Sequence, residues 1–199
     1  VLFFLAVLVP LVVLRFFPHV FLFNSIWGWF PGPIYDEVIS FDISLLWHRV
    51  YVLLGASLFW FGGSWLASEV TTRKISLVFT LLSILFLVFT LNLHRIGIVH
   101  PLSHIAGELG GKLESDQIVL IYDPEGMDED IASEWLFWLD FHLADLANKL
   151  EVDKPTEKVT AVVYRDQWQK HRFTGARRTS YVPTWNFSPQ LHLDMESGL

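Results

Sequence analysis

The sequence predicts an α-helical transmembrane region followed by an α+β domain outside the membrane. Residues up to about Leu93 are dominated by Leu, Phe, Val and Trp, whereas those after His100 have the composition of a soluble acidic domain. Mean hydropathy is +0.41 and 16% of residues are aromatic, both high for a soluble protein. Strand-like and helix-like segments then alternate after His100, which is typical of an α+β layer.

Three apolar segments are long enough to cross a bilayer, which takes roughly 20 helical residues. They are residues 1–23, 45–67 and 75–93, so we assign about three spans and a transmembrane region over residues 1–95. Buried helices of a soluble protein are the alternative, but three such segments so close together favour membrane spans. The lipid bilayer is therefore an expected partner.

The loops between these segments predict the orientation. Arg73 and Lys74 follow the second segment, whereas the loop before that segment holds three acidic residues and no Lys or Arg. The positive-inside rule places Arg73 and Lys74 in the cytoplasm, which leaves the C-terminal domain extracytoplasmic on the cytoplasmic (inner) membrane. Arg15 and the pair His48 and Arg49 run against this asymmetry, and we expect them to snorkel or to face neighbouring helices.

Charge and cysteine content exclude several function classes. The chain after His100 holds 17 acidic and nine basic residues, which gives it a net charge of −8. That balance argues against nucleic-acid binding, which favours a basic face. The chain has no cysteine, which excludes disulfides and zinc sites with thiolate ligands.

The acidic part is expected to comprise a juxtamembrane linker over residues 96–115 and an α+β domain over residues 116–199. Expected strands are 117–122, 159–164 and 191–195, and 166–171 is expected as a short helix. A long helix is expected over residues 128–150, capped by Asp128 or Asp130. Its predicted core stripe, at helical spacing, consists of Ile131, Trp135, Trp138, Leu139, His142, Leu143, Leu146 and Leu150.

Two histidines near the start of this part have the spacing of metal ligands. His100 and His104 would share a helical face, with Glu108 one turn further on. Pro101 interrupts the first turn, and no acid lies between the histidines to act as a base. Histidines just outside the membrane are the alternative, which the pattern favours.

The loop Thr174–Ser180, TGARRTS, has only a weak likeness to a phosphate loop, because it lacks the glycine spacing and the GK[ST] ending. The alternative is an ordered loop in which Gly175 adopts an unusual backbone angle and an arginine pairs with an acid. Ser180 and His192 have no third partner, so a serine hydrolase is not supported.

The last strand places Gln190, His192 and Asp194 on one face and Leu191 and Leu193 on the other. We expect the leucines to face the core and the polar residues to face solvent or a cleft. An exposed edge beside a cleft can bind an extended peptide as an added strand. An ordinary half-buried strand is the alternative.

The segment VTAVVYRDQWQKHRFTGARRTSYVPTWNFSPQLHLD, Val159–Asp194, resembles the region upstream of the zinc motif in gluzincin-type (peptidase MA) metallopeptidases. The likeness lies in a strand that ends in an aromatic and a charged residue, a T-G-A loop, an aromatic-rich passage and an L-H-L strand. The segment GPIYDEVISFDISLLWHR is similar to the ABC-permease-like membrane portion to which some such domains are attached, so transporter subunits are possible partners.

The resemblance implies a peptide substrate that pairs with residues 190–194 and is flanked by the loop of Arg177 and Arg178. The implied substrate-binding residues are Gln190, His192, Asp194 and Arg178. Zinc is implied for a full-length family member. The family holds it with H-E-x-x-H, in which two histidines bind the metal and the glutamate polarises its water.

This sequence contains no H-E-x-x-H, so no catalytic or metal residue is assigned and the residues present are expected to bind no zinc. Because the chain begins with Val1 inside an apolar run, without a basic leader or a small-residue cleavage site, we interpret it as an excerpt rather than as a signal peptide start. The zinc helix would then follow Leu199, beyond an incomplete domain.

The sequence thus predicts the amino-terminal part of a membrane-anchored zinc metallopeptidase, inactive by itself. One alternative is a transporter-associated or sensory membrane protein with a non-catalytic peptide-binding domain. Another is a family member that has lost its zinc site and only binds peptides.

Overall fold

The computed structural model describes residues 16–19, 21–24, 28–31, 43–67, 73–183 and 187–197. The chain divides into two compact units. One comprises residues 1–22, 30–39 and 100–199, and the other comprises residues 23–29 and 40–99. The first holds an α+β domain and the second holds a helical hairpin.

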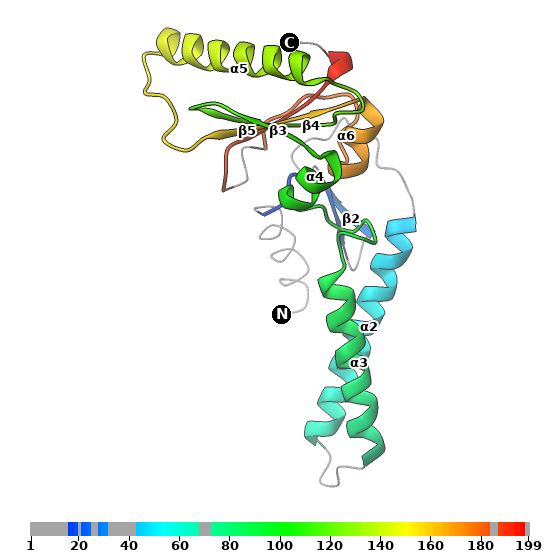
Figure 1. The fold of residues 1–199 in the computed structure, drawn as a ribbon. Helices are drawn as coiled ribbons and strands as arrows, with labels where there is room; N and C mark the ends of the chain where they lie inside the picture. Colours follow the sequence, from blue (N-terminus) through cyan, green and yellow to red (C-terminus); the bar gives the residue numbers. More distant parts are fainter. Residues whose placement is uncertain are drawn as a thin grey trace. The chain divides into compact units, whose positions relative to one another are not determined.

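The hairpin consists of α2 (Ile43–Ala67) and α3 (Arg73–Leu91), which lie side by side (Figure 1). Tyr51 stacks on Phe86 with ring centroids 4.8 Å apart, and its hydroxyl lies 3.3 Å from that of Thr90. Near the other end, Trp65 stacks on Phe79 at 5.9 Å.

Two glycines of α2 make room for the phenylalanines of α3. A Cβ atom at Gly55 would lie 3.3 Å from the ring of Phe86, and one at Gly62 would lie 3.1 Å from the ring of Phe79. The two glycines are seven residues apart in α2, and the two phenylalanines are seven residues apart in α3. This spacing repeats one face of each helix, so the contacts form a single seam.

The three predicted membrane spans are not supported. Among the described residues, only α2 contains a stretch long and apolar enough to cross a membrane, Ile43–Trp65. The corresponding apolar stretch of α3, Ser76–Leu91, is shorter. Residues 1–15 of the first predicted span lie outside the described residues.

The first predicted span is also wrong at its end, because β1 (Phe21–Asn24) is a strand. It pairs with β2 (Gly28–Pro31) in a two-stranded sheet.

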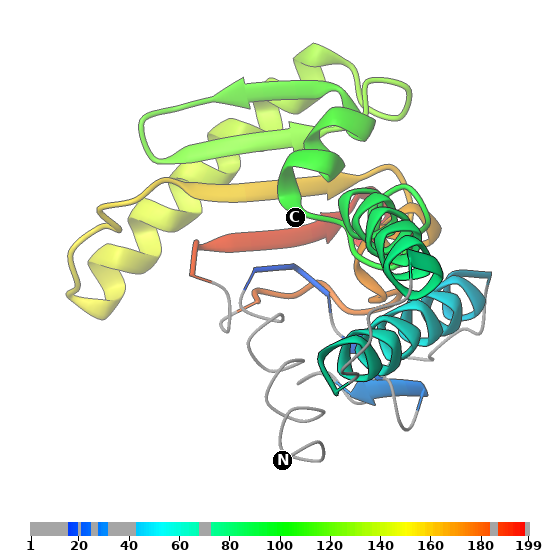
Figure 2. The ribbon, with the colours of Figure 1, turned by 90° about the horizontal axis from the view of Figure 1, so that it is seen from below.

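The domain is built on a four-stranded sheet of order β3-β4-β5-β6 (Figure 2). β3 pairs antiparallel with β4, whereas β4, β5 and β6 are parallel. The strands are β3 (Gly111–Glu114), β4 (Ile118–Tyr122), β5 (Val159–Tyr164) and β6 (Gln190–Asp194). The register sets Leu120 beside Ala161 and Val162 beside His192. The three expected strands and the α+β class are therefore confirmed.

Helices connect the parallel strands. α5 (Glu129–Leu150) joins β4 to β5, and α6 (Gln167–Thr174) joins β5 to β6, after which a 3-10 turn follows at Met195–Ser197. The predicted cap is confirmed, since Asp128 accepts a bond from the Ile131 amide at 2.8 Å. Two further elements, α4 (Leu102–Leu109) and β3, lie where the linker was expected, so the domain begins earlier than residue 116.

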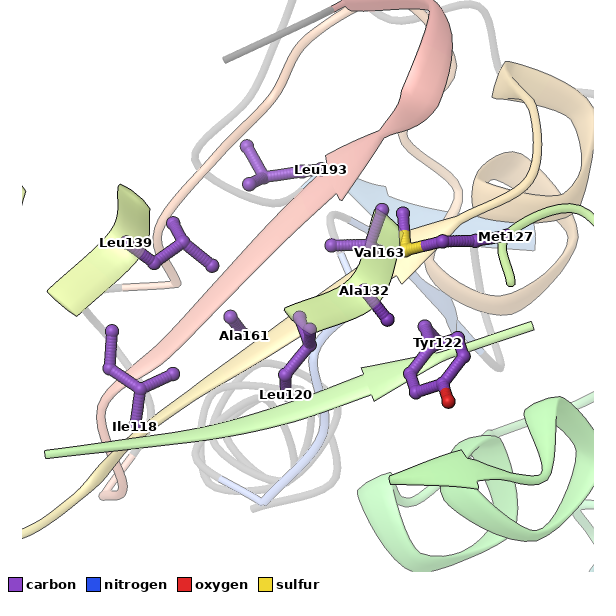
Figure 3. Close-up of a cluster of buried hydrophobic side chains, with 9 residues drawn as sticks. All are labelled: Ile118, Leu120, Tyr122, Met127, Ala132, Leu139, Ala161, Val163 and Leu193. Atoms are coloured by element: carbon purple, nitrogen blue, oxygen red, sulfur yellow. The ribbon is translucent and has the colours of Figure 1, made fainter. Parts of the chain in front are cut away.

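The main core lies between α5 and one face of the sheet (Figure 3). Its buried residues are Ile118, Leu120, Tyr122, Met127, Ala132, Leu139, Ala161, Val163 and Leu193. A second cluster lies on the opposite face, against α4 and α6, and consists of Ile105, Leu109, Ile121, Val162, Tyr164 and Phe173.

The predicted core stripe of α5 is only partly correct. Leu139 is buried, and Trp135 and Leu143 pack against the core. The remaining five, including His142, are exposed: Ile131, Trp138, His142, Leu146 and Leu150. The buried face instead includes Ala132 and Ala147, whose small side chains let the helix lie close to the sheet. A prediction that relies on the spacing of large apolar residues does not detect these alanines.

Candidate functional site

Both faces of β6 are covered, which changes the interpretation of its polar residues. Gln190, His192 and Asp194 are all buried, so the expectation that they face solvent is wrong. Leu193 faces the α5 side, and His192 faces the side of the second cluster. The sheet therefore buries the polar face of β6 as fully as the apolar one.

His192 is held by ring stacking and two hydrogen bonds. Its ring is nearly parallel to those of Tyr164 and Tyr181, with centroids at 6.0 and 5.0 Å and planes within 16° of parallel. Nε2 lies 3.2 Å from Oε1 of Gln190, and Nδ1 lies 3.0 Å from the Tyr164 hydroxyl. Because an amide oxygen can only accept, Nε2 carries the proton and Nδ1 accepts from Tyr164.

Burial keeps both of these groups neutral. Desolvation, and secondarily the charge of Lys170, lowers the pKa of His192 to about 3. Desolvation likewise raises the pKa of Tyr164 well above its usual value. Neither group changes its charge near neutral pH, so in the described arrangement the pair provides hydrogen bonds rather than a proton.

A buried ion pair ties α6 to the end of β6. The ammonium of Lys170 donates to the carboxylate of Asp194, and neither side chain is more than 3% exposed. The Thr174 hydroxyl, one turn further along α6, donates to the Lys170 carbonyl at 2.8 Å. Asp194 is thus engaged inside the domain instead of facing a substrate.

The outer edge of β6 already carries a partner. The Tyr181 amide donates to the His192 carbonyl at 3.1 Å, and the His192 amide donates to the Tyr181 carbonyl at 2.9 Å. The Tyr181 hydroxyl donates to the carbonyl of Pro18. The edge is therefore able to form antiparallel main-chain bonds, and the chain itself makes them at the central residue of the strand.

Three histidines stack beside this network. The rings of His19 and His100 are 5.7 Å apart, and those of His100 and His104 are 5.3 Å apart. The His100 amide donates to Nε2 of His19 at 3.2 Å. Desolvation, followed by the charges of His100 and His192, lowers the pKa of His19 to about 3.

This stack does not fit a zinc site. A metal ion lies in the plane of each imidazole that binds it, whereas these ring planes are within 15° of parallel and stacked. Glu108 is exposed on α4. In the part of the chain that the structure describes, no group of three or more histidine or acidic side chains could hold a metal ion.

The arginine loop is anchored to α6. Arg177 lies over the ring of Trp168, 3.4 Å from its centroid, and donates to Oε1 of Gln167 at 3.2 Å. Gly175 has φ of +82°, which confirms the predicted unusual backbone angle. Arg178 is exposed. Of the four implied substrate residues, only Arg178 lies at the surface.

Sequence reasoning missed Tyr164, Lys170 and Tyr181, on which the network depends. Tyr164 ends a strand and Lys170 lies within a polar helix, so neither pattern signals burial. Comparisons of this chain with protein-family models, curated proteins and solved structures found no match.

Proposed function

We propose that this chain is the membrane-anchored, peptide-binding part of a zinc metallopeptidase. The observation that carries the proposal is the outer edge of β6, where His192 and Tyr181 exchange two main-chain hydrogen bonds in antiparallel orientation. A substrate peptide would extend this pairing along the strand by main-chain bonds. The likeness of residues 159–194 to gluzincin-type peptidases supplies the reaction class.

The hairpin supports the membrane anchor. Its large apolar residues point outward, with Leu53 67% and Phe59 83% exposed. Four side-chain hydroxyls and one amide also donate to carbonyls four residues earlier in the chain. Such internal bonds suit hydrocarbon, because hydrocarbon offers polar groups no other partner. These bonds, 2.8–2.9 Å long, are made by Ser64, Thr80, Ser83, Thr90 and Asn92.

The anchor is tested by placing charge on the outward face. Leu53→Arg is expected to deplete the protein from the membrane fraction, because a central charge costs about 2.5–3.5 kcal/mol during insertion. Phe137→Arg, at a similarly exposed position of the domain, is the control and is expected to remain membrane-bound. Equal membrane association of both variants would count against the anchor.

The orientation is a separate part of the proposal. Arg73 and Lys74 lie at one end of the hairpin, while Arg49 and Arg95 lie toward the other, so the charge difference is small. An alkaline phosphatase reporter fused after Gly111 is expected to be active. Cytoplasmic retention of the reporter would reverse the proposed orientation.

The sequence contains no H-E-x-x-H to hold zinc, so no catalytic step is assigned to its residues. Any residues encoded after Leu199 would test the peptidase assignment. An H-E-x-x-H on an apolar helix would support it, and a longer chain should then bind zinc. Its absence from the natural continuation would reject the assignment.

Peptide binding is tested independently of zinc. An alternating Val-Thr decapeptide is expected to bind the purified chain, whereas the same peptide N-methylated at every residue is not, because complete methylation removes the main-chain donors from both edges of the extended peptide. Equal binding of both peptides would reject strand addition.

A second candidate is a transporter-associated or sensory protein with a non-catalytic domain. It is favoured by the internal bonds of Gln190, His192 and Asp194, which hold the domain together. Peptide binding without a zinc motif in the continuation would support this candidate. A further membrane span after Leu199 would support its transporter form.

A further inference from the structure

Helix α5, which lies along one face of the sheet (Figure 1), exposes an aromatic patch that consists of Phe137, Trp138 and Phe141. These side chains are 63%, 40% and 51% exposed, respectively. The ring of Trp138 touches both neighbours, with centroids 5.6 Å from Phe137 and 5.8 Å from Phe141. Single exposed apolar residues are ordinary, but a contiguous aromatic cluster marks an interaction surface.

Acidic residues lie on both sides of the aromatic patch. Glu134 precedes Trp138 by four residues and Asp145 follows Phe141 by four, so each lies one helical turn from the patch. Glu134 is exposed. Asp145 pairs with Lys149 at 2.7 Å in a solvent-exposed bridge, which contributes little and is readily exchanged.

We propose that the aromatic patch of α5 docks a basic amphipathic segment of another protein. The apolar side chains of that segment would cover the three rings, and its Lys or Arg side chains would meet Glu134 and Asp145. His142 already stacks on the ring of Trp138 with centroids 6.0 Å apart, so a cation from the partner would interact with the opposite face of that ring. The surface and this partner therefore match in both apolar and charged character.

The charges disfavour two other occupants. An anionic lipid surface would be repelled by Glu134 and by Asp130, which is exposed one turn earlier, whereas Lys149 offsets the charge of Asp145. A second copy of this chain would bring the same carboxylates together, since a symmetric contact pairs a face with itself. A basic segment places cations beside these carboxylates, whereas an anionic lipid surface or a second copy of the chain would place further negative charge there.

The proposal is tested with a fluorescein-labelled amphipathic helix of about 18 residues, made of Leu and Lys, and a matched helix in which Glu replaces Lys. The full chain is held in phosphatidylcholine nanodiscs, with empty nanodiscs as the blank, and binding is measured by anisotropy. The Lys peptide is expected to bind and the Glu peptide is not. Trp138→Ser with Phe141→Ser is expected to weaken binding about tenfold or more, and these exposed sites leave the core intact.

A charge-matched pair of variants separates this site from general attraction to an acidic protein. Glu134→Gln with Asp145→Asn is expected to weaken binding several-fold and to reduce its salt dependence. Asp153→Asn with Glu157→Gln, on an exposed loop, makes the same change in charge and is expected to bind as the unmodified chain does.

Three results would overturn the proposal. The first is equal binding of the Lys peptide by the serine variant and the unmodified chain. The second is binding of vesicles containing phosphatidylglycerol through Trp138 in place of the peptide. The third is self-association, measured by sedimentation, that Phe141→Ser abolishes. These results are independent of whether the β6 edge binds substrate.

Discussion

Lys170 of α6 and Asp194 of β6 form an ion pair that is buried away from solvent, with 0% and 3% of their side chains exposed, respectively. Removing two charges from water is costly, and their mutual attraction offsets that cost only while they remain paired. The pair fixes the helix to the strand that runs through the candidate site. Loss of one partner would leave the other charge buried and uncompensated.

Lys170→Met should therefore destabilise the domain by about 3–5 kcal/mol. The measurement is urea unfolding of the full chain followed by tryptophan fluorescence. Lys158→Met is the control, because Lys158 and Glu114 form an exposed pair, and its cost should stay below about 1 kcal/mol. Adding Asp194→Leu to Lys170→Met should recover most of the loss. No recovery in the double variant would mean that the charges are not the cause.

The domain should lose stability as the pH falls from 6.5. His19 and His192 have folded pKa values of about 3 instead of 6.5, so the unfolded chain takes up protons in this range that the folded chain does not. Their stabilisation is fully present above pH 6.5 and is lost as the pH falls toward 3. Each histidine contributes a slope of up to about 1.4 kcal/mol per pH unit.

The slope is measured by urea unfolding at several pH values above the usual carboxylate range, which centres at about 4. The pKa values of Glu114, bonded by Lys158 and Lys112, and of Asp166, bonded by the Gln169 amide, are lowered, so these groups act only at more acidic pH. His192→Phe should reduce the slope by about half, whatever its effect at neutral pH. An unchanged slope would exclude His192 as a source.

Gly62→Leu should separate α2 from α3, because even its Cβ atom would lie 3.1 Å from Phe79. Gly63→Leu is a matched control, since a Cβ atom at Gly63 meets nothing within 4 Å. The chain has no native cysteine, so Tyr51→Cys and Thr90→Cys can be introduced on the facing helices. The yield of their cross-linking by a short bis-maleimide then measures how closely α2 and α3 pack. Cross-linking should fall in the Gly62 variant alone. Equal yields in the two variants would argue against close packing at Gly62.

Tyr181→Ala should open the outer edge of β6. The substitution removes a ring stacked on His192 and the hydroxyl bond to Pro18, which together contribute about 1–3 kcal/mol. Hydrogen exchange of the His192 amide should accelerate about tenfold or more. Val182→Ala, at an exposed side chain, is the control and should leave exchange unchanged. Unaltered exchange in the Tyr181 variant would mean that other contacts hold the edge.

The sequence was a good guide to the elements of the domain. β4 and β5 are continuous apolar runs bounded by turns, and β6 alternates, so all three were predicted. β3 was not, because four residues that include Lys112 and Glu114 have no strand pattern apart from their pairing with β4. A short edge strand depends on its neighbour more than on its own residues.

The candidate site was less predictable than the fold. Alternation correctly placed Gln190, His192 and Asp194 on one face, but it does not tell whether distant segments cover that face. Here residues 16–19 and 175–183 contribute to the cover, through the contacts of Pro18, His19 and Tyr181. The rotation of α5 was missed for a related reason, because its buried alanines carry no strong hydrophobic signal.

The two edge strands of the four-stranded sheet, β3 and β6, are protected in different ways from pairing with strands of other molecules. β3 is only four residues long and exposes the ion pair of Lys112 and Glu114, whereas β6 is covered at its centre by Tyr181. Unprotected borders would let neighbouring copies join their sheets into aggregates. The proposed membrane anchor would raise the local concentration of the protein and so favour such encounters. The Tyr181 contact would therefore limit pairing between crowded copies at the centre of β6, and the proposed substrate would pair with the strand beyond that contact.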